Sequence, residues 1–244
     1  MSGTALNSTR PVWLFDLDNT LHDATPHIFP HINRAMATYI RDHVGVDDDE
    51  ATRIRLDYWQ RYGATLLGLM RHHGTDPQHF LRHTHDFPDL KRMLVFERGL
   101  NAMLRRLPGR KIVFSNAPLA YSEAVLELVG VRNRFAALYS VERLRFQPKP
   151  ALGAFRHLLR RERLSPQRCI MVEDSLANLK TAKHLGMKTV WISDRTRQPP
   201  WLDLRLRSVL ELPRHWQRLH LPQFGWRSLP RARKLFAGAG GGAP

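Results

Sequence analysis

The stretch Trp13–Leu21 reads WLFDLDNTL and joins a short apolar run to two aspartates, Asp16 and Asp18, which are separated by one leucine. The run Val12–Phe15 is typical of a strand that is buried in a parallel sheet. Ligands of such sheets bind beyond the carboxyl ends of the strands. We therefore expect Asp16 to lie at a ligand-binding edge of the sheet.

The spacing of these two carboxylates has a physical cost. Two neighbouring negative charges repel each other, which raises the pKa of one of them. A divalent cation removes this cost, and oxygen ligands suit Mg²⁺. The alternative is that both aspartates cap the start of the following helix.

The rest of the chain alternates between strand-like and helical segments. Helical patterns include YSEAVLELVG and SLANLKTAKHLG, which end at Gly130 and Gly186, and glycine is a helix stop signal. Such alternation predicts an α/β protein with a Rossmann-like parallel sheet. The further predicted strands are Lys111–Asn116, Cys169–Asp174 and Lys188–Ser193.

A long segment without a strand-like run follows the first strand. Between Asp23 and Arg92 the apolar residues recur at helical spacing, as in Leu66 and Leu69. We expect residues 23–92 to form an inserted helical domain, and residues 11–22 and 93–213 to form the core. Residues 214–244 form a basic tail, and its last stretch, RARKLFAGAGGGAP, is expected to be disordered because it has little apolar surface to bury.

Composition limits the class of protein. The chain has 244 residues, 43% of them hydrophobic, and a single cysteine, Cys169, which excludes a disulfide framework. Because Cys169 lies in an apolar run, we expect a buried thiol. The sequence has no apolar run near the roughly 20 residues that span a bilayer and no signal-peptide pattern. We expect a soluble, cytoplasmic protein without a membrane partner.

The net charge of +16 raises the alternative of nucleic-acid binding. From Arg195 onward there are ten Arg and Lys residues against two acidic ones, so much of the excess lies near the end of the chain. A solvated tail explains this pattern as well, and we expect a small phosphorylated substrate rather than nucleic acid. The residues on which nucleic-acid binding would depend are Trp226, Arg227, Arg231, Arg233 and Lys234.

Polar residues follow the ends of the other predicted strands. Ser115 and Asn116 provide a hydroxyl and amides that can hold a phosphate oxygen. Lys149 stands between two prolines, which restrict its backbone. Singly, each has another interpretation: a turn residue, a surface lysine, or, for Glu173 and Asp174, a helix cap. Together and in this order they indicate a phosphate site.

The segments DLDNT, FSNA, PKP and VEDSLANLKTA resemble, in order, the four motifs of the haloacid dehalogenase-like (HAD) hydrolase superfamily. The resemblance covers residues 11–212, and the helical insertion resembles a C1-type cap. YWQRYGATLLGL followed by FSNA is most similar to the pyrimidine 5'-nucleotidase family. The expected fold is therefore a Rossmann-like core with an inserted α-helical cap.

The resemblance implies a role for each motif residue. Asp16 would attack phosphorus and form an aspartyl-phosphate, and Asp18 would act as general acid and base. Mg²⁺ would be held by Asp16, the backbone carbonyl of Asp18, and Asp174. Ser115, the backbone amide of Asn116, and Lys149 would neutralise the phosphoryl oxygens. Glu173 and Asn178 would act through bound waters or through the ligands, and Asn178 replaces an acid found in other members.

The motifs also separate the superfamily's chemistries. Dehalogenases of this fold need neither a metal nor an acid two residues after the nucleophile, so Asp18 favours phosphate chemistry. Related phosphonate hydrolases use a cap lysine, and no lysine occurs between Met1 and Leu90. The predicted function is Mg²⁺-dependent hydrolysis of pyrimidine nucleoside 5'-monophosphates such as UMP and CMP. A phosphatase or mutase that acts on sugar phosphates or other small metabolites is the alternative.

The cap would recognise the leaving group. Aromatic faces and an amide in this segment can stack on a base and read it, although packing between helices explains the aromatic residues too. The acidic run Asp47–Glu50 is expected to cap a helix, and His79 with His83 is expected to be a solvated face rather than a Zn²⁺ site. The candidate recognition residues are Phe29, Asn33, Tyr58, Trp59 and Tyr62.

Overall fold

The computed structural model describes residues 10–219, and the basic segment from residue 220 onward lies outside them. Six parallel strands form one sheet in the order β3-β2-β1-β4-β5-β6, which confirms the predicted α/β fold. The strands are β1 (Val12–Phe15), β2 (Arg110–Phe114), β3 (Ala137–Tyr139), β4 (Cys169–Glu173), β5 (Lys188–Ile192) and β6 (Leu204–Leu206).

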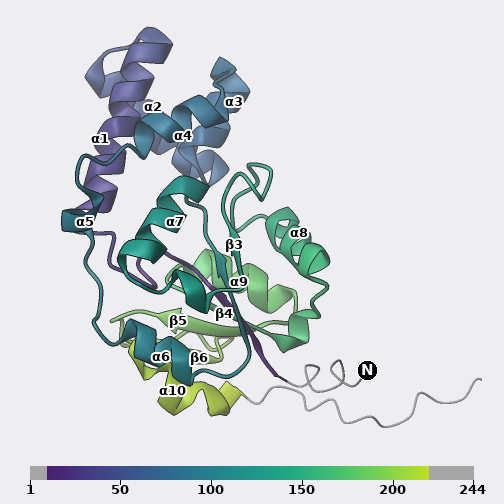
Figure 1. Cartoon of the computed structure of the whole chain (residues 1–244). Helices are drawn as coiled ribbons and strands as arrows, with labels where there is room; N and C mark the ends of the chain where they lie inside the picture. Colours follow the sequence, from purple (N-terminus) through teal and green to yellow (C-terminus); the bar gives the residue numbers. More distant parts are fainter. Residues whose placement is uncertain (1–9, 220–244) are drawn as a thin grey trace, which may run out of the picture. The chain divides into compact units, whose positions relative to one another are not determined.

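The central strand β1 is buried on both faces because its residues are all apolar and point alternately to opposite sides. Trp13 and Phe15 join a cluster on one face, which helices α6, α7 and α10 cover. Val12 and Leu14 join a second cluster under α8 and α9. Figure 1 shows the helices around the sheet. Their bounds are α6 (Leu100–Arg106), α7 (Leu119–Leu128), α8 (Leu152–Glu162), α9 (Leu176–His184) and α10 (Leu212–His215).

Some details of the sheet go beyond the sequence analysis. The short strand β3 has no counterpart among the predicted strands, and β6 and α10 follow the last predicted strand in the chain. Cys169 is buried at the start of β4, as predicted, and burial raises the pKa of its thiol to about 12. Short 3₁₀ turns complete the core at Arg132–Arg134, Pro166–Arg168, Val209–Glu211 and Trp216–Leu219.

The segment between β1 and β2 is helical, as expected. Its helices enclose a separate apolar cluster that includes Ile40, Leu69 and Phe80. Leu90 and Met93, in the last of these helices, pack instead against the cluster of the core that contains Trp13 and Phe15. The elements are α1 (Ile28–Ile40), a π-helical turn (Arg41–Gly45), α2 (Asp48–Tyr62), α3 (Thr65–His73), α4 (Pro77–Thr84) and α5 (Leu90–Met93).

Local sequence sets the bounds and the packing of α2. The Asp47 side chain accepts a hydrogen bond from the Glu50 amide at 2.8 Å, so the predicted helix cap is confirmed. Gly63 ends the helix in a left-handed conformation with φ of 78°, which glycine adopts at little cost. Gly68 lets α3 approach α2, because a Cβ atom there would lie 2.2 Å from the Tyr58 ring. Among the described helices, none is both long and apolar enough to cross a bilayer.

Candidate active site

The sheet brings three strand ends together. β2 and β4 flank β1, and Phe15 is in register with Val113 and Val172. Asp16 follows β1 directly, and its amide donates to the Val172 carbonyl at 3.0 Å. Ser115 therefore follows the strand on one side, while Glu173 ends the strand on the other. Three of the motifs singled out in the sequence meet at this edge.

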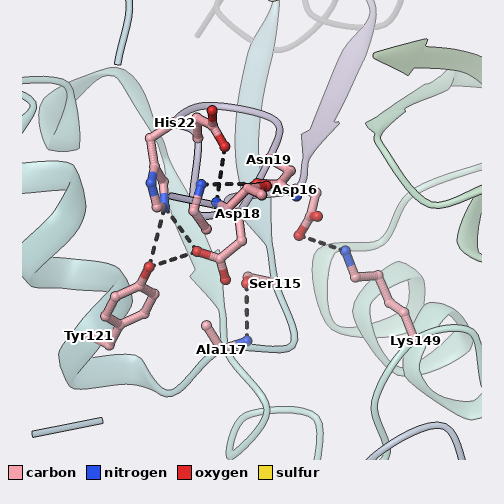
Figure 2. A network of polar contacts seen from close by, with 11 residues as sticks. Asp16, Asp18, Asn19, His22, Ser115, Ala117, Tyr121 and Lys149 are labelled. Carbon is pink, nitrogen blue, oxygen red and sulfur yellow. Dashed lines mark hydrogen bonds and ion pairs between the residues drawn. The ribbon is translucent and has the colours of Figure 1, made fainter. Parts of the chain in front are cut away.

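Lys149 reaches the same edge from the loop before α8. Its buried Nζ atom donates to Asp16 Oδ1 at 2.9 Å and to Glu173 Oε2 at 2.6 Å. The Asn116 side chain holds the lysine backbone, because its Oδ1 accepts from the Lys149 amide at 2.8 Å and its Nδ2 donates to the Lys149 carbonyl at 2.9 Å. Figure 2 shows the lysine directed at Asp16. Asn116 thus fixes the backbone from which the Lys149 ammonium extends.

The cluster carries more negative than positive charge. Burial, together with the Glu173 carboxyl, raises the pKa of Asp16 well above the usual value of an aspartate. Burial likewise raises the pKa values of Glu173 and Asp174. Burial by itself lowers the pKa of an ammonium, but Asp16 and Glu173 outweigh it and raise the pKa of Lys149. One cation faces three carboxyl groups.

This excess fits a bound cation. Asp16, Glu173 and Asp174 each offer a carboxylate oxygen, and the three oxygens lie within 4.8 Å of one another. Carboxylate oxygens are the ligands that Mg²⁺ prefers in proteins. Within residues 10–219, this is the one such convergent group of acidic, histidine or cysteine side chains. His79 and His83, for which we expected a solvated face rather than a Zn²⁺ site, are not part of this group, and the centroids of their rings lie 4.0 Å apart.

Two buried side chains hold Asp18. The Tyr121 hydroxyl donates to Asp18 Oδ1 at 2.7 Å, and His22 Nε2 lies 2.9 Å from the same oxygen (Figure 2). Burial and the adjacent Asp18 carboxyl raise the pKa of Tyr121, so its hydroxyl remains a donor. His22 is buried as well. Tyr121 carries no functional signal in the sequence, because its position in an amphipathic helix looks like ordinary core.

The remaining motif residues lie around this cluster. Ser115 is buried, and its Oγ accepts from the Ala117 amide at 3.0 Å, which leaves the hydroxyl proton free to donate (Figure 2). Asn178 is buried in α9, just after the strand end that carries Asp174. The Asp174 carbonyl accepts from Trp191 Nε1 at 2.8 Å, which ties the loop to β5.

A cavity of about 570 Å³ adjoins Asp18 and Asn116. Most of its lining comes from the inserted helices and is apolar, and Trp59 in this lining is 59% exposed. Burial lowers the pKa of His85, another lining residue, to about 4, so its ring is uncharged near neutral pH. The walls therefore suit a largely apolar group.

The candidate recognition residues divide between this cavity and other positions. Phe29, Asn33 and Trp59 line the cavity. Tyr58 and Tyr62 do not, because their hydroxyls lie 2.8 Å from His73 Nε2 and 2.6 Å from His72 Nε2 respectively, and both histidines are in α3. Tyr62 lines a different hollow, which is next to Lys149.

Arg55 is a cavity residue that the sequence analysis missed. One of its terminal nitrogens, Nη1, donates to Asn33 Oδ1 at 3.0 Å. Arginine has only donors, and this contact uses the acceptor of the Asn33 amide. The pair therefore presents N–H donors to the cavity. A helical arginine in an arginine-rich chain gives no sequence signal, so only the fold reveals this contact.

Comparisons with known proteins show the relatives of this chain. A family model described as haloacid dehalogenase-like hydrolase matches residues 12–186. A phosphoglycolate phosphatase from Mesorhizobium japonicum is 28% identical over 193 residues, covering 75% of this chain and 82% of that protein. Phosphate metabolism protein 8 from Saccharomyces cerevisiae is 33% identical over 67 residues, covering 28% of this chain but only 21% of that longer protein.

A solved structure shares the fold. It is a HAD phosphatase from Thermococcus onnurineus, with a TM-score of 0.61 and 20% identity. The similarity covers 88% of this chain and 99% of that one.

Proposed function

This chain belongs to the haloacid dehalogenase-like hydrolases, and we propose that it is a Mg²⁺-dependent phosphomonoesterase that hydrolyses pyrimidine nucleoside 5'-monophosphates such as UMP and CMP. The observation that carries the proposal is the buried cluster of Asp16, Lys149 and Glu173 beside Asp18. Residues 23–92 act as the cap in this proposal, and they supply most of the cavity wall.

The metal ion would be held by Asp16, the backbone carbonyl of Asp18, and Asp174, and the acidic cluster fits it. When bound, it supplies positive charge to the phosphoryl oxygens. Glu173 and Asn178 would orient this set directly or through bound waters. The side chains of Ser115 and Lys149, with the Asn116 backbone amide, neutralise the remaining phosphoryl charge.

The reaction proceeds in two displacements. An Asp16 carboxylate oxygen forms a bond to phosphorus while the bond from phosphorus to the ester oxygen breaks, and Asp18 protonates the departing alkoxide. Asp18 then takes a proton from water as the water oxygen attacks the aspartyl-phosphate. The bond between Asp16 and phosphorus breaks, which frees inorganic phosphate and restores both aspartates.

The cavity lining supports a pyrimidine as the leaving group. Trp59 offers an exposed aromatic face for stacking. The donors of Asn33 and Arg55 match the carbonyl oxygens of uracil and the one carbonyl oxygen of cytosine. A sugar phosphate would place hydroxyl groups against mainly apolar walls, where they lose their hydrogen bonds to water.

The first test is phosphate release from a panel of UMP, CMP, AMP, GMP, glucose 6-phosphate and phosphoglycolate, each with Mg²⁺ and with EDTA. We expect UMP and CMP to exceed the purine nucleotides at least about tenfold in kcat/KM, as shape differences in a binding pocket produce. EDTA should abolish release. A preference for glucose 6-phosphate or phosphoglycolate would reject pyrimidine nucleotides as the substrate but would leave the proposed mechanism in place. If no substrate gave Mg²⁺-dependent phosphate release, the proposed phosphatase activity would be rejected.

Substitution of Arg55 tests the recognition pair. Arg55→Ala should reduce the ratio of kcat/KM for UMP to kcat/KM for phenyl phosphate by about tenfold. The variant loses a hydrogen bond from the charged guanidinium to the base carbonyl of UMP, whereas phenyl phosphate has no such carbonyl to lose. Arg53→Ala is the matched control, since Arg53 lies in the same helix, is exposed and pairs with Glu50. Equal ratios in both variants would contradict the recognition role.

A further inference from the structure

We propose that Tyr121 and His22 are positioning residues that hold one oxygen of the Asp18 carboxyl, so that the other oxygen exchanges protons with the ester oxygen of the substrate. The proposal rests on the proposed phosphatase function and assigns a specific task to two residues outside the motifs. Figure 2 shows both side chains directed at Asp18, with Tyr121 coming from α7 and His22 from the loop after β1.

Both contacts go to the same carboxylate oxygen. The Tyr121 hydroxyl donates to Oδ1 at 2.7 Å, and His22 Nε2 lies 2.9 Å from it. His22 Nδ1 is buried without a hydrogen-bond partner, which favours the tautomer with the proton on Nε2, because a buried N–H without an acceptor costs free energy. His22 is then also a donor to Oδ1.

Two donors on Oδ1 decide where the Asp18 proton resides. When Asp18 carries a proton as the general acid, a proton on Oδ1 would compete with the two hydrogen bonds, so the proton is placed on Oδ2. The contacts of residues 10–219 leave Oδ2 without a protein hydrogen bond, and Asp18 lines the cavity while 18% of its side chain remains exposed. Oδ2 is therefore the oxygen available to the leaving group. Orientation of this kind contributes to general acid catalysis.

The fold holds this pair of donors rigidly. Tyr121 and His22 are 3% and 4% exposed. The Tyr121 ring also lies 5.2 Å from the ring of Phe87 and 5.7 Å from that of His85. Near the start of α7, the Leu119 amide donates to the Glu142 carboxylate at 3.0 Å, which fixes the turn that carries the tyrosine. Replacement of Tyr121 by phenylalanine removes the hydroxyl and keeps these ring contacts.

The test compares two leaving groups in the Tyr121→Phe variant. Phenolate needs protonation as it leaves, whereas 4-nitrophenolate is stable without it. kcat/KM reports the steps up to departure of the phenol, so it is insensitive to the later attack of water. We expect kcat/KM for phenyl phosphate to fall about tenfold more than kcat/KM for 4-nitrophenyl phosphate, a part of the roughly 10²-fold effect of a general acid.

Two controls separate positioning from stability. Tyr139→Phe removes a similar buried hydrogen bond, to Glu162 at 2.7 Å, and should leave the ratio of the two substrates unchanged. His22→Gln, which keeps a donor, should retain the ratio better than His22→Leu. Equal losses for both substrates in Tyr121→Phe, or no loss, would overturn the inference while leaving the phosphatase intact. Wild-type protein that hydrolyses neither these substrates nor any member of the phosphomonoester panel would reject the proposed function and this inference with it.

Discussion

An Asp16→Asn variant is expected to release phosphate at least about 10³-fold more slowly than the wild type from every phosphomonoester that the protein hydrolyses. The amide is nearly the same shape as the carboxyl but is a poor nucleophile, so the covalent step is lost and only substrate positioning remains. Phosphate release under saturating substrate measures the loss. Mass spectrometry of acid-quenched turnover mixtures should detect the phosphorylated protein in the wild type alone.

The fold of this variant should persist. Burial disfavours the charged form of the three carboxyl groups and raises their pKa values, and the substitution replaces one of them, Asp16, by a neutral amide. Asp23→Asn is the matched control: Asp23 is exposed on the same loop, and its carboxylate accepts from the Thr25 amide. Its activity should match that of the wild type. Phosphorylated protein in Asp16→Asn, or a loss shared equally with Asp23→Asn, would show that Asp16 is not the nucleophile.

The sequence predicts the central strands of the fold well because burial leaves a direct signal there. Val12–Phe15 is apolar throughout, as a strand covered on both faces requires. β3 gives no such signal, because it has three residues at the edge of the sheet and so short a run has no distinctive period. No single segment of the sequence specifies the order of the strands. The order of the motifs suggests that Asp16 and Glu173 lie together, and the fold shows the contact of both with Lys149.

Site residues, too, can be predicted from the sequence only where they leave a distinctive local signal. Lys149 was found because two prolines mark its position, whereas Tyr121 and Arg55 lie in helices at positions that packing or solvation explains equally well. Tyr58 and Tyr62 share a helical face, as their spacing predicts, and their rings are 5.9 Å apart. Whether that face turns to the cavity depends on α3, whose His72 and His73 lie within hydrogen-bond distance of both hydroxyls. Helix periodicity cannot supply that information.

Removal of the Lys149 ammonium is expected to cause the largest loss of stability in the site. Its Nζ lies between Asp16 and Glu173 with 1% of the side chain exposed, so Lys149→Met leaves two buried carboxyl groups without their cation. Loss of one partner from a buried ion pair costs roughly 3–5 kcal/mol in the free energy of unfolding. Urea unfolding in the presence of EDTA measures this change without a metal ion to compensate.

A second substitution separates charge from packing. The double variant Lys149→Met, Glu173→Gln removes one of the two uncompensated carboxyls and should recover part of the lost stability, while phosphate release stays at least about 10²-fold below the wild type because the phosphoryl oxygens still lack the ammonium. Lys180→Met, an exposed lysine in α9, is the control and should change neither property. If Lys149→Met unfolded at the same urea concentration as the wild type, the ammonium would not be what compensates these carboxyls. If the double variant were no more stable than Lys149→Met, the lost stability would come from packing of the lysine chain rather than from its charge.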